Sequence, residues 1–404
     1  MRLHQTIVFF VVMVILGACA SVAPPIINTP QPTVAGPNET FSTAIPPAPA
    51  WRSPARPISR QTVAEIENLG RLDFGGMPST IFTYAFSPDG TRLVGLNNTN
   101  LVGWDLITGQ FMLNNTRQNA SAVFYSPDKS ELYTVASNGT VTIYGADSGV
   151  AIANFSGHEQ FNGYVAYDPL NGWLALGGSD GKIYVWDMPE RLALAVFSAH
   201  ETNVRSMIFS PDGTRLVSSG EDGRNFLWNW RDSTILHDLT NSGVLTIRMA
   251  YSPNGDTIAI ATNELIILWD ARSGQFIHSL PTGVGGSESL LLFSPDGKFL
   301  VNGGDIPDMM VWSGEAGNAF LAYLPNMGQG RISAQFSPNS QMLLTSKFEG
   351  ATVLWDMTQI TDETVVRANL NPETERVVFV DWSPDGFAML FFDASGVVYV
   401  WGLP

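Results

Sequence analysis

Cysteine and basic residues are both scarce in this 404-residue chain. Its single cysteine, Cys19, excludes a disulfide within the chain, so the fold must be stabilised by its own core. Lys and Arg number 21 against 37 Asp and Glu, and the formal net charge of −16 argues against a nucleic-acid partner, whose phosphates would be repelled. Hydrophobic residues make up 45% of the chain, which is enough for a large core.

Motifs for catalysis or metal binding are scarce as well. The five histidines are scattered, with no pair at metal-ligand spacing and no cysteine partner. Residues 177–181 match the G-x-S-x-G motif of α/β hydrolases, but that motif needs a turn from a strand into a helix, and here it lies between two predicted strands. We therefore predict a protein that is not an enzyme and has no metal or cofactor.

Long apolar runs are missing except near the start of the chain. Residues 7–16 are apolar and follow the basic Arg2, which is typical of a secretory signal and too short to cross a bilayer as a helix. Residues 16–19, Leu-Gly-Ala-Cys, resemble the bacterial lipobox. The resemblance implies that residues 1–18 are a lipoprotein signal peptide and that Cys19 carries the lipid. The alternative is an ordinary signal peptide cleaved near Ala20, with Cys19 discarded.

We interpret residues 19–60 as a Pro-rich tether. Ten prolines lie between positions 20 and 57, among residues that have little to bury, so this stretch is expected to stay extended. At ~3.1 Å per residue its reach is on the order of 100 Å. This layout suits an anchored, exported protein with a globular body at residues 61–404.

Eight copies of one short phrase organise that body. Their starts are 39, 42, 42, 42, 42, 43 and 46 residues apart, and such a period indicates a repeat architecture. The copies are FSPDG at 86–90, YSPDK at 125–129, YDPLN at 167–171, FSPDG at 209–213, YSPNG at 251–255, FSPDG at 293–297, FSPNS at 336–340 and WSPDG at 382–386.

Residues 203–239 show what one repeat contains. Four runs with strand character, at 204–209, 215–219, 225–228 and 234–239, are separated by turn signals such as Ser-Pro-Asp-Gly at 210–213. In that turn proline presets φ and glycine accepts a positive φ. One four-stranded sheet cannot bury both faces alone, so we expect the sheets to stack radially.

An aromatic residue ends the third strand of each repeat, 17 or 18 residues after the Ser or Asp of its turn. These are Trp104, Tyr144, Trp186, Trp228, Trp269, Trp312, Trp355 and Trp401, and Asp follows four of them. In these two signals the chain resembles the WD-repeat (WD40) β-propeller family over roughly residues 62–404. The resemblance implies an all-β, eight-bladed β-propeller with four antiparallel strands per blade.

The family resemblance also implies a buried hydrogen-bonded set in some blades. The full set falls on His200, Ser218 or Ser219, Asp222 and Trp228, and a partial set falls on His158, Asp180 and Trp186, where Gly177-Gly178 replaces the hydroxyl. A His–Asp–Ser grouping also suggests a hydrolase. We favour the structural role, because these residues would be buried between strands and repeat at blade spacing.

The eighth repeat has three strands before the sequence stops at Pro404. The missing strand resembles residues 65–72, Glu-Ile-Glu-Asn-Leu-Gly-Arg-Leu. We therefore predict that this early strand pairs with the last blade and closes the ring, which removes two open sheet edges.

A partner-facing site is expected where the innermost strands begin, around the central channel. Seven positions fall there: Phe82, Ser121, Arg205, Ile247, Ser289, Ile332 and Val378. The ring is mostly small or apolar, unlike a catalytic pocket, which gathers titratable groups. We expect its one charge, Arg205, to pair with a nearby acid such as Glu201 or Glu221.

The leading functional prediction is an exported, lipid-anchored scaffold at the bacterial cell envelope, with a monomeric body that binds a protein or peptide and meets the membrane through Cys19. One alternative is a propeller enzyme of the lactonase or quinoprotein type, which would collect acids, asparagines or histidines around the channel. Another is a periplasmic propeller like that of the Tol system, whose repeats share the FSPDG phrase.

Overall fold

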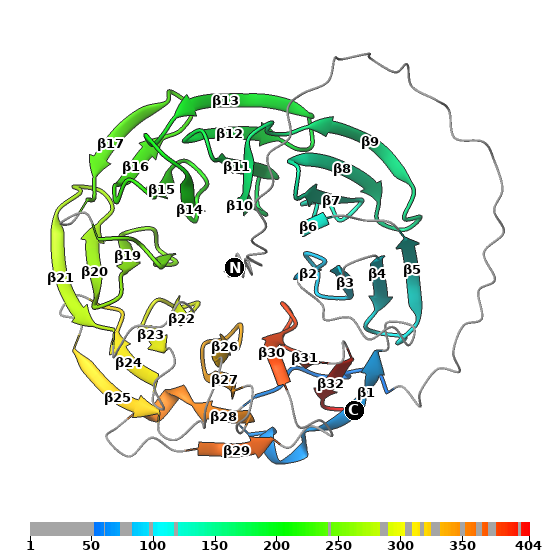
Figure 1. Ribbon diagram of the computed structural model, residues 1–404. Helices are drawn as coiled ribbons and strands as arrows, with labels where there is room; N and C mark the ends of the chain where they lie inside the picture. Colours follow the sequence, from blue (N-terminus) through cyan, green and yellow to red (C-terminus); the bar gives the residue numbers. More distant parts are fainter. Residues whose placement is uncertain are drawn as a thin grey trace.

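Eight antiparallel sheets of four strands each are arranged in a ring, as the blades of a propeller (Figure 1). The computed structural model describes residues 52–59, 61–72, 83–96, 100–116, 120–240, 244–282, 290–303, 309–315, 319–324, 332–347, 352–360, 366–370, 377–394 and 397–404. The prediction of an all-β, eight-bladed propeller with four-stranded blades is confirmed. The helical segments in these ranges, η1 (Val63–Glu65) and η2 (Met357–Gln359), are short 3-10 segments, and no described helix has the length and apolar character to cross a membrane.

Each blade runs from an innermost strand near the ring axis to an outermost strand at the circumference, and we number the blades 1 to 8 in the order of their innermost strands. The innermost strands are β2 (Thr83–Phe86), β6 (Ala120–Tyr125), β10 (Phe161–Asp168), β14 (Val204–Phe209), β18 (Arg248–Tyr251), β22 (Leu290–Phe293), β26 (Ile332–Phe336) and β30 (Val377–Trp382). The second strands are β3 (Arg92–Leu96), β7 (Glu131–Ala136), β11 (Trp173–Gly178), β15 (Leu216–Gly220), β19 (Thr257–Ala261), β23 (Phe299–Gly303), β27 (Met342–Lys347) and β31 (Ala388–Asp393).

The outer half of each blade completes the sheet. The third strands are β4 (Asn100–Asp105), β8 (Thr140–Gly145), β12 (Lys182–Asp187), β16 (Asn225–Asn229), β20 (Leu265–Asp270), β24 (Met309–Ser313), β28 (Thr352–Asp356) and β32 (Val398–Gly402). The outermost strands are β5 (Phe111–Thr116), β9 (Ala151–Ser156), β13 (Leu192–Ser198), β17 (Thr234–Asp238), β21 (Phe276–Pro281), β25 (Phe320–Leu324), β29 (Val366–Leu370) and, in blade 8, β1 (Glu67–Leu72).

Apolar side chains pack between neighbouring blades and form the core. The cluster between blades 3 and 4, for example, joins Ile183 and Val185 of β12 to Val204 and Met207 of β14 and to Trp228 of β16. Burial of this kind stabilises a sheet by about 25 cal/mol for each Å² of apolar surface removed from water. Each blade therefore depends on its neighbours, as the repeat pattern predicted.

The repeated Ser-Pro-Asp-Gly phrase forms the turn between the first two strands of a blade. In blade 1 the Ser87 hydroxyl donates to Asp89 Oδ1 at 2.6 Å and accepts the backbone N–H of Arg92 at 3.0 Å. The same two bonds recur at Ser126, Ser210, Ser252, Ser294, Ser337 and Ser383, with Asp or Asn two residues on. The phrase is thus part of the scaffold, because its polar groups are used within the turn.

Two of these turns have a side chain where the others have glycine. Lys129 and Ser340 have φ of 59° and 60°, the left-handed region in which L side chains are strained. Lys129 forms an ion pair with Asp89, and the Ser340 hydroxyl accepts the backbone N–H of Asp296 at 2.9 Å. Each strained residue therefore ties its turn to the turn of the preceding blade.

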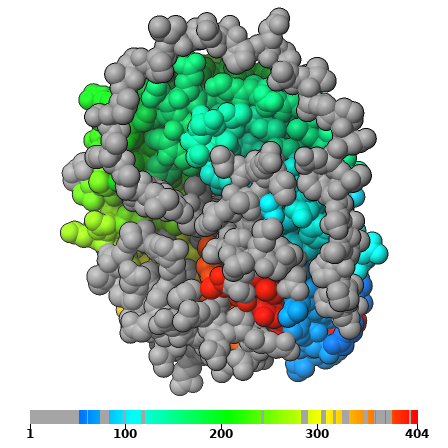
Figure 2. Space-filling model, turned by 45° about the vertical axis from the view of Figure 1, so that its right-hand side comes forward, coloured from blue at the N-terminus to red at the C-terminus, as the bar shows by residue number. Residues whose placement is uncertain are grey.

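The ring is closed by the predicted early strand. β1 pairs antiparallel with β32, from Glu67 opposite Gly402 to Leu72 opposite Val398, with a bulge between Asn68 and Gly70. In Figure 2 the blue segment near the N-terminus lies against the red C-terminal segment. The strand begins two residues later than the predicted 65–72, because Val63–Glu65 is a 3-10 turn.

Residues 52–59 also lie against blade 8, although we predicted them as part of the tether at 19–60. The backbone N–H of Ile58 donates to the carbonyl of Gly386, and that of Ala55 donates to Leu403. The Ile58 side chain is buried at 2% exposure. Residues 52–59 therefore belong to the propeller, since this Pro-containing stretch has one large apolar side chain to bury.

A polar contact joins the first and last blades at the inside of the ring. The Tyr84 hydroxyl of β2 donates to Asp381 Oδ2 of β30 at 2.8 Å, and the Tyr84 ring stacks on Phe392 with centroids 4.4 Å apart. Burial raises the pKa of Asp381 to about 6, against the hydrogen bond from Tyr84.

Candidate functional site

The predicted polar set is brought together in blade 4. His200 lies in the connection that enters the blade, Ser218 in β15, Asp222 in the turn between β15 and β16, and Trp228 in β16. Antiparallel pairing sets Ser218 opposite Phe226, two residues before the tryptophan. The histidine ring fits over Gly220, where a Cβ atom would lie 2.5 Å from His200 Nδ1.

These four side chains form one continuous hydrogen-bonded chain. Trp228 Nε1 donates to Ser218 Oγ at 2.9 Å, and Ser218 Oγ lies 2.8 Å from His200 Nε2. His200 Nδ1 lies 3.2 Å from both carboxylate oxygens of Asp222. The Asp222 carboxylate also accepts the backbone N–H groups of Glu201 and Arg224.

The network fixes where the protons sit. Asp222 can only accept, so His200 Nδ1 carries the proton, and Nε2 accepts from the Ser218 hydroxyl, which in turn accepts from Trp228. Burial lowers the pKa of His200, and although Asp222 acts in the opposite direction, the imidazole is neutral at pH 7.

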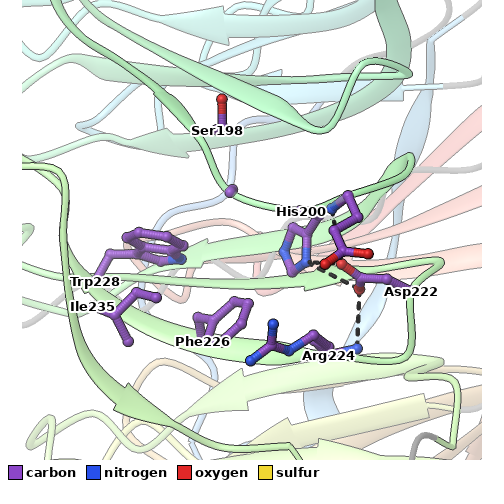
Figure 3. A pocket seen from close by; sticks show the side chains of 9 residues that line it. Ser198, His200, Asp222, Arg224, Phe226, Trp228 and Ile235 are labelled. Carbon is purple, nitrogen blue, oxygen red and sulfur yellow. Dashed lines mark hydrogen bonds and ion pairs between the residues drawn. The ribbon is translucent and has the colours of Figure 1, made fainter.

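This arrangement has the members of a catalytic triad but not the access that one needs. A hollow of about 260 Å³ opens beside the set and is lined by Ser198, His200, Asp222, Arg224, Phe226, Trp228 and Ile235, together with Ala199 and Glu201 (Figure 3). Ser218 does not line it and is fully buried, at 0% exposure. A substrate in this hollow does not reach the Ser218 hydroxyl that His200 binds, so the geometry supports a structural role.

Blade 3 holds the partial set in a different arrangement. His158 Nδ1 accepts the backbone N–H of Gln160 at 3.1 Å, so its proton sits on Nε2, which faces the Lys182 carbonyl at 3.3 Å and Asp180 Oδ1 at 3.6 Å. Trp186 Nε1 donates to the Gly157 carbonyl at 3.0 Å. The histidines of blades 3 and 4 therefore hold opposite tautomers.

The structure resolves the hydroxyl position in blade 4 and corrects it in blade 3. Of the two serines left open in blade 4, Ser218 makes the bonds, whereas Ser219 Oγ is buried without a partner. In blade 3 the hydroxyl is replaced by Leu176, opposite Tyr184, and not by Gly177-Gly178. Gly178 instead makes room for the imidazole, because a Cβ there would lie 2.4 Å from the His158 ring.

The position that Ser218 occupies recurs eight residues after the first polar residue of every turn phrase. These positions are Gly95, Thr134, Leu176, Ser218, Ile260, Asn302, Thr345 and Phe391. Where Asn302 and Thr345 stand, their oxygens accept the indole N–H of Trp312 at 2.7 Å and of Trp355 at 2.8 Å. Where Ile260 and Phe391 stand, the indole N–H groups of Trp269 and Trp401 are buried without a partner. Sequence reasoning missed this pattern, although the spacing contains it.

The predicted channel residues lie at the start of the innermost strands as far as they are described. Ser121 in β6, Arg205 in β14 and Val378 in β30 each sit in a β-bulge, opposite no partner residue. Ile247 precedes β18 and Ile332 opens β26. Phe82 and Ser289 lie outside the described residues.

Arg205 does not form the expected ion pair with Glu201, Glu221 or any other described acid. Glu221 Oε2 accepts instead from Asn203 Nδ2 at 2.9 Å, and Glu201 lies at the hollow beside His200, held there by its backbone bond to Asp222. Within the described ranges there is also no group of three His, Cys, Asp or Glu side chains placed to hold a metal ion.

Comparison with known families gives a match to the family described as WD domain, G-beta repeat, over residues 149–187 and 192–229. Each matched stretch covers the outermost strand of one blade and the first three strands of the next. No curated protein matches the chain.

Two solved structures have a similar fold over most of this chain. The crystal structure of the computationally designed Ika8 protein is 21% identical, has a TM-score of 0.67, and the match covers 82% of this chain and 99% of that one. A chain from the crystal structure of a mitotic checkpoint complex is 17% identical, with a TM-score of 0.55 and coverage of 91% and 99%. At these identities the likeness shows the fold alone.

Proposed function

From the premise that this chain is a WD40-repeat β-propeller, we propose that it is an exported, lipid-anchored, non-catalytic scaffold that binds a protein partner at the bacterial cell envelope. WD40 propellers commonly bind proteins, and the family is mostly non-catalytic. The polar groups that repeat in this chain are used to build turns and blades, which leaves its surface for recognition.

The observation that carries this proposal is the apolar circumference of the ring. Large apolar side chains are exposed on the outermost strands of blades 1 to 6, which we call the rim: Phe111, Ile152, Leu192, Val196, Ile235, Leu236, Phe276, Ile277, Phe320 and Tyr323. Apart from two histidines, the six rim strands contain one residue that is charged at neutral pH, Asp238. Edge strands are normally protected by charge, so an uncharged, apolar edge indicates a surface that a partner covers.

The outer edge of blade 8 shows what such cover looks like. Its outermost strand, β1, carries Glu67 and Arg71, and the backbone N–H of Arg52 donates to the Leu69 carbonyl at 3.0 Å. Arg52 also pairs with Glu67 at 2.6 Å. Here an extended segment of the chain and charged side chains cover the edge, whereas the rim strands of blades 1 to 6 carry a single acid, Asp238, and no Lys or Arg.

Cross-linking at the rim tests partner binding. A photo-reactive phenylalanine analogue placed at Ile277 or Tyr323 of the full chain, expressed in a bacterium, should give discrete adducts with a protein after irradiation. The matched control is the same analogue at Glu190, an exposed polar turn residue, where no adduct is expected. Rim positions that give no adduct, or only those seen at Glu190, contradict the proposal.

The anchor rests on the lipobox-like residues 16–19 and on the Pro-rich stretch that follows them. Intact-mass analysis of the mature protein should show an N-terminal Cys19 that carries acyl chains, and Cys19→Ser should move the protein from the membrane fraction to the soluble one. An unmodified N-terminus near Ala20 would leave the rim proposal in place and remove the anchor.

A further inference from the structure

Among the basic side chains that the structure describes, one is left without a partner. Arg205 forms no ion pair, hydrogen bond or ring contact, whereas every other Lys or Arg whose side chain the structure describes has one. Arg191, for example, pairs with Glu131, and Arg231 lies over the rings of Trp173 and Trp230. With 37 acids against 21 bases in the chain, an unpaired arginine is unexpected.

The backbone holds Arg205 in an unusual place. It is half-buried at the start of β14, in a bulge between Val204 and Ser206. A bulge re-aims the side chain of its extra residue, and bulges occur often beside binding sites. The carbonyl of Val204 is held by Asn162 Nδ2 of the neighbouring blade at 2.7 Å, which fixes the strand just before the arginine.

A glycine on the adjacent strand of blade 3 faces open space. β10 packs against β14 and has its own bulge between Phe161 and Val165. Within that bulge Gly163 has φ of 97°, and a Cβ built on it would meet no atom within 4 Å. A glycine that faces open space lets the backbone of a ligand approach closely.

We propose that Arg205 and Gly163 form a binding site, at the inside of the ring between blades 3 and 4, for a peptide segment that carries one carboxylate. This inference rests on the proposed protein-binding function and names the chemistry that one part of the surface recognises. A guanidinium binds a carboxylate through two parallel hydrogen bonds, which gives both orientation and specificity.

The surrounding charge restricts the ligand further. A net charge of −16 repels polyanions at long range, so the segment carries no further acid, and we take its flanks to be uncharged. The equivalent starts of the neighbouring innermost strands fit such flanks, because Ser121 and Ile247 are uncharged.

Selection of displayed peptides on the purified full chain tests the site. Random dodecapeptides should enrich for sequences with a single Asp or Glu among uncharged residues. For the enriched peptides, synthesised with the acid or with the matching amide, Arg205→Met should raise the Kd at least tenfold. Replacing the acid by the amide should cause the same loss on the wild type and no further loss on Arg205→Met, since both changes remove one interaction. Arg272→Met, at an exposed turn of blade 5, is the matched control and should leave the Kd unchanged.

The outcomes separate this inference from the proposed function. Enriched peptides that bind Arg205→Met as tightly as the wild type, or that contain no acid, overturn the site and leave protein binding at the rim untouched. If no peptide binds in an Arg205-dependent manner and the rim also gives no cross-linked adduct, both proposals fail. A thermal melt of Arg205→Met equal to that of the wild type confirms that the variant is folded.

Discussion

Blades 3 and 4 are neighbours with the same spacing of His, Asp and Trp, yet they use these residues differently. In each blade the aspartate comes 22 residues after the histidine, and the tryptophan comes 28 residues after the histidine. In blade 4 the histidine bonds Ser218 and Asp222, and in blade 3 it bonds the backbone of Gln160 and Lys182. The difference follows from one position, where blade 4 has Ser218 and blade 3 has Leu176.

The comparison teaches that the blade geometry does not require the polar set. Without a hydroxyl, His158 takes the other tautomer and Trp186 finds a backbone carbonyl. Where neither solution exists, as at Trp269 and Trp401, the blade still forms and the indole N–H stays unpaired. Apolar packing between blades therefore determines the fold, and the polar set adds to stability.

The comparison assumes that both blades are part of a closed ring, so opening the ring should cause the largest loss of stability. Removing residues 61–72 from the Cys19→Ser chain exposes the edge of β32 and the core around Leu69 and Leu72, which are 1% and 2% exposed. The variant should be insoluble or lose a cooperative melt by circular dichroism. Removing residues 24–50, within the predicted tether, should leave the melt unchanged, and equal melts for both deletions would contradict closure.

Breaking the blade 4 network should have the next largest effect. Ser218→Ala leaves His200 Nε2 and Trp228 Nε1 buried without partners, so the free energy of unfolding should fall by about 2 kcal/mol in urea denaturation. The adjacent Ser219 is the control, because its buried hydroxyl has no partner and Ser219→Ala should cost nothing. Equal losses for the two variants would show that the network contributes nothing specific.

Acidification should weaken both blades, because the pKa of each buried histidine is lowered, chiefly by burial. The unfolded chain binds protons below a pKa of about 6.5, while the folded imidazoles stay neutral. The contribution of these histidines to stability is therefore complete above about pH 6.5 and is lost as the pH falls through the lowered pKa values of the folded imidazoles. The free energy of unfolding should fall by about 1 kcal/mol between pH 7.5 and 6.

The measurement is the urea midpoint at the two pH values in an Asp381→Asn background. This background is needed because the raised pKa of Asp381, about 6, contributes with the opposite sign. A midpoint that rises on acidification would contradict neutral, buried histidines.

Supplying the missing hydroxyl to blade 5 should give the smallest effect. Ile260 occupies the Ser218 position, and the indole N–H of Trp269 lacks a partner. Ile260→Thr and Ile260→Val have nearly the same shape, so their difference isolates the hydroxyl. A buried hydroxyl without a partner destabilises a protein, but here the threonine hydroxyl can accept the Trp269 indole N–H. The free energy of unfolding of Ile260→Thr should therefore be about 0.5–1 kcal/mol higher than that of Ile260→Val in urea denaturation. A threonine variant less stable than the valine variant would contradict the pairing.

The fold could be predicted from the sequence because its signals are local. The Ser-Pro-Asp-Gly turns use bonds between residues two and five apart, and their spacing fixed the number of blades. The closing strand 65–72 was recognised because one outermost strand was missing, and β1 confirms it. Residues 52–59 were missed, because proline-rich composition hides the burial of Ile58.

The site was less predictable because it depends on register. Counting back from the tryptophan does not find the Ser218 position in every blade, because the shorter hairpins of blades 1 and 5 shift it, whereas counting forward from the turn phrase does; the strand pairing showed which count to use. Glu221 does not pair with Arg205 because it accepts a hydrogen bond from Asn203. No sequence pattern predicts this contact between two loop residues.

The register of the closing strand is the most direct test of this account. Arg71 of β1 lies opposite Tyr399 of β32, and directly opposed residues of antiparallel strands have Cα atoms about 4.5–5.5 Å apart, within the range that a disulfide spans. The chain with Cys19→Ser, Arg71→Cys and Tyr399→Cys should form an intramolecular disulfide on mild oxidation, seen as a faster band on a non-reducing gel. Only intermolecular disulfides, or an equal yield when the second cysteine is placed at Gly402 instead, would show that the ring is not closed by β1 in this register.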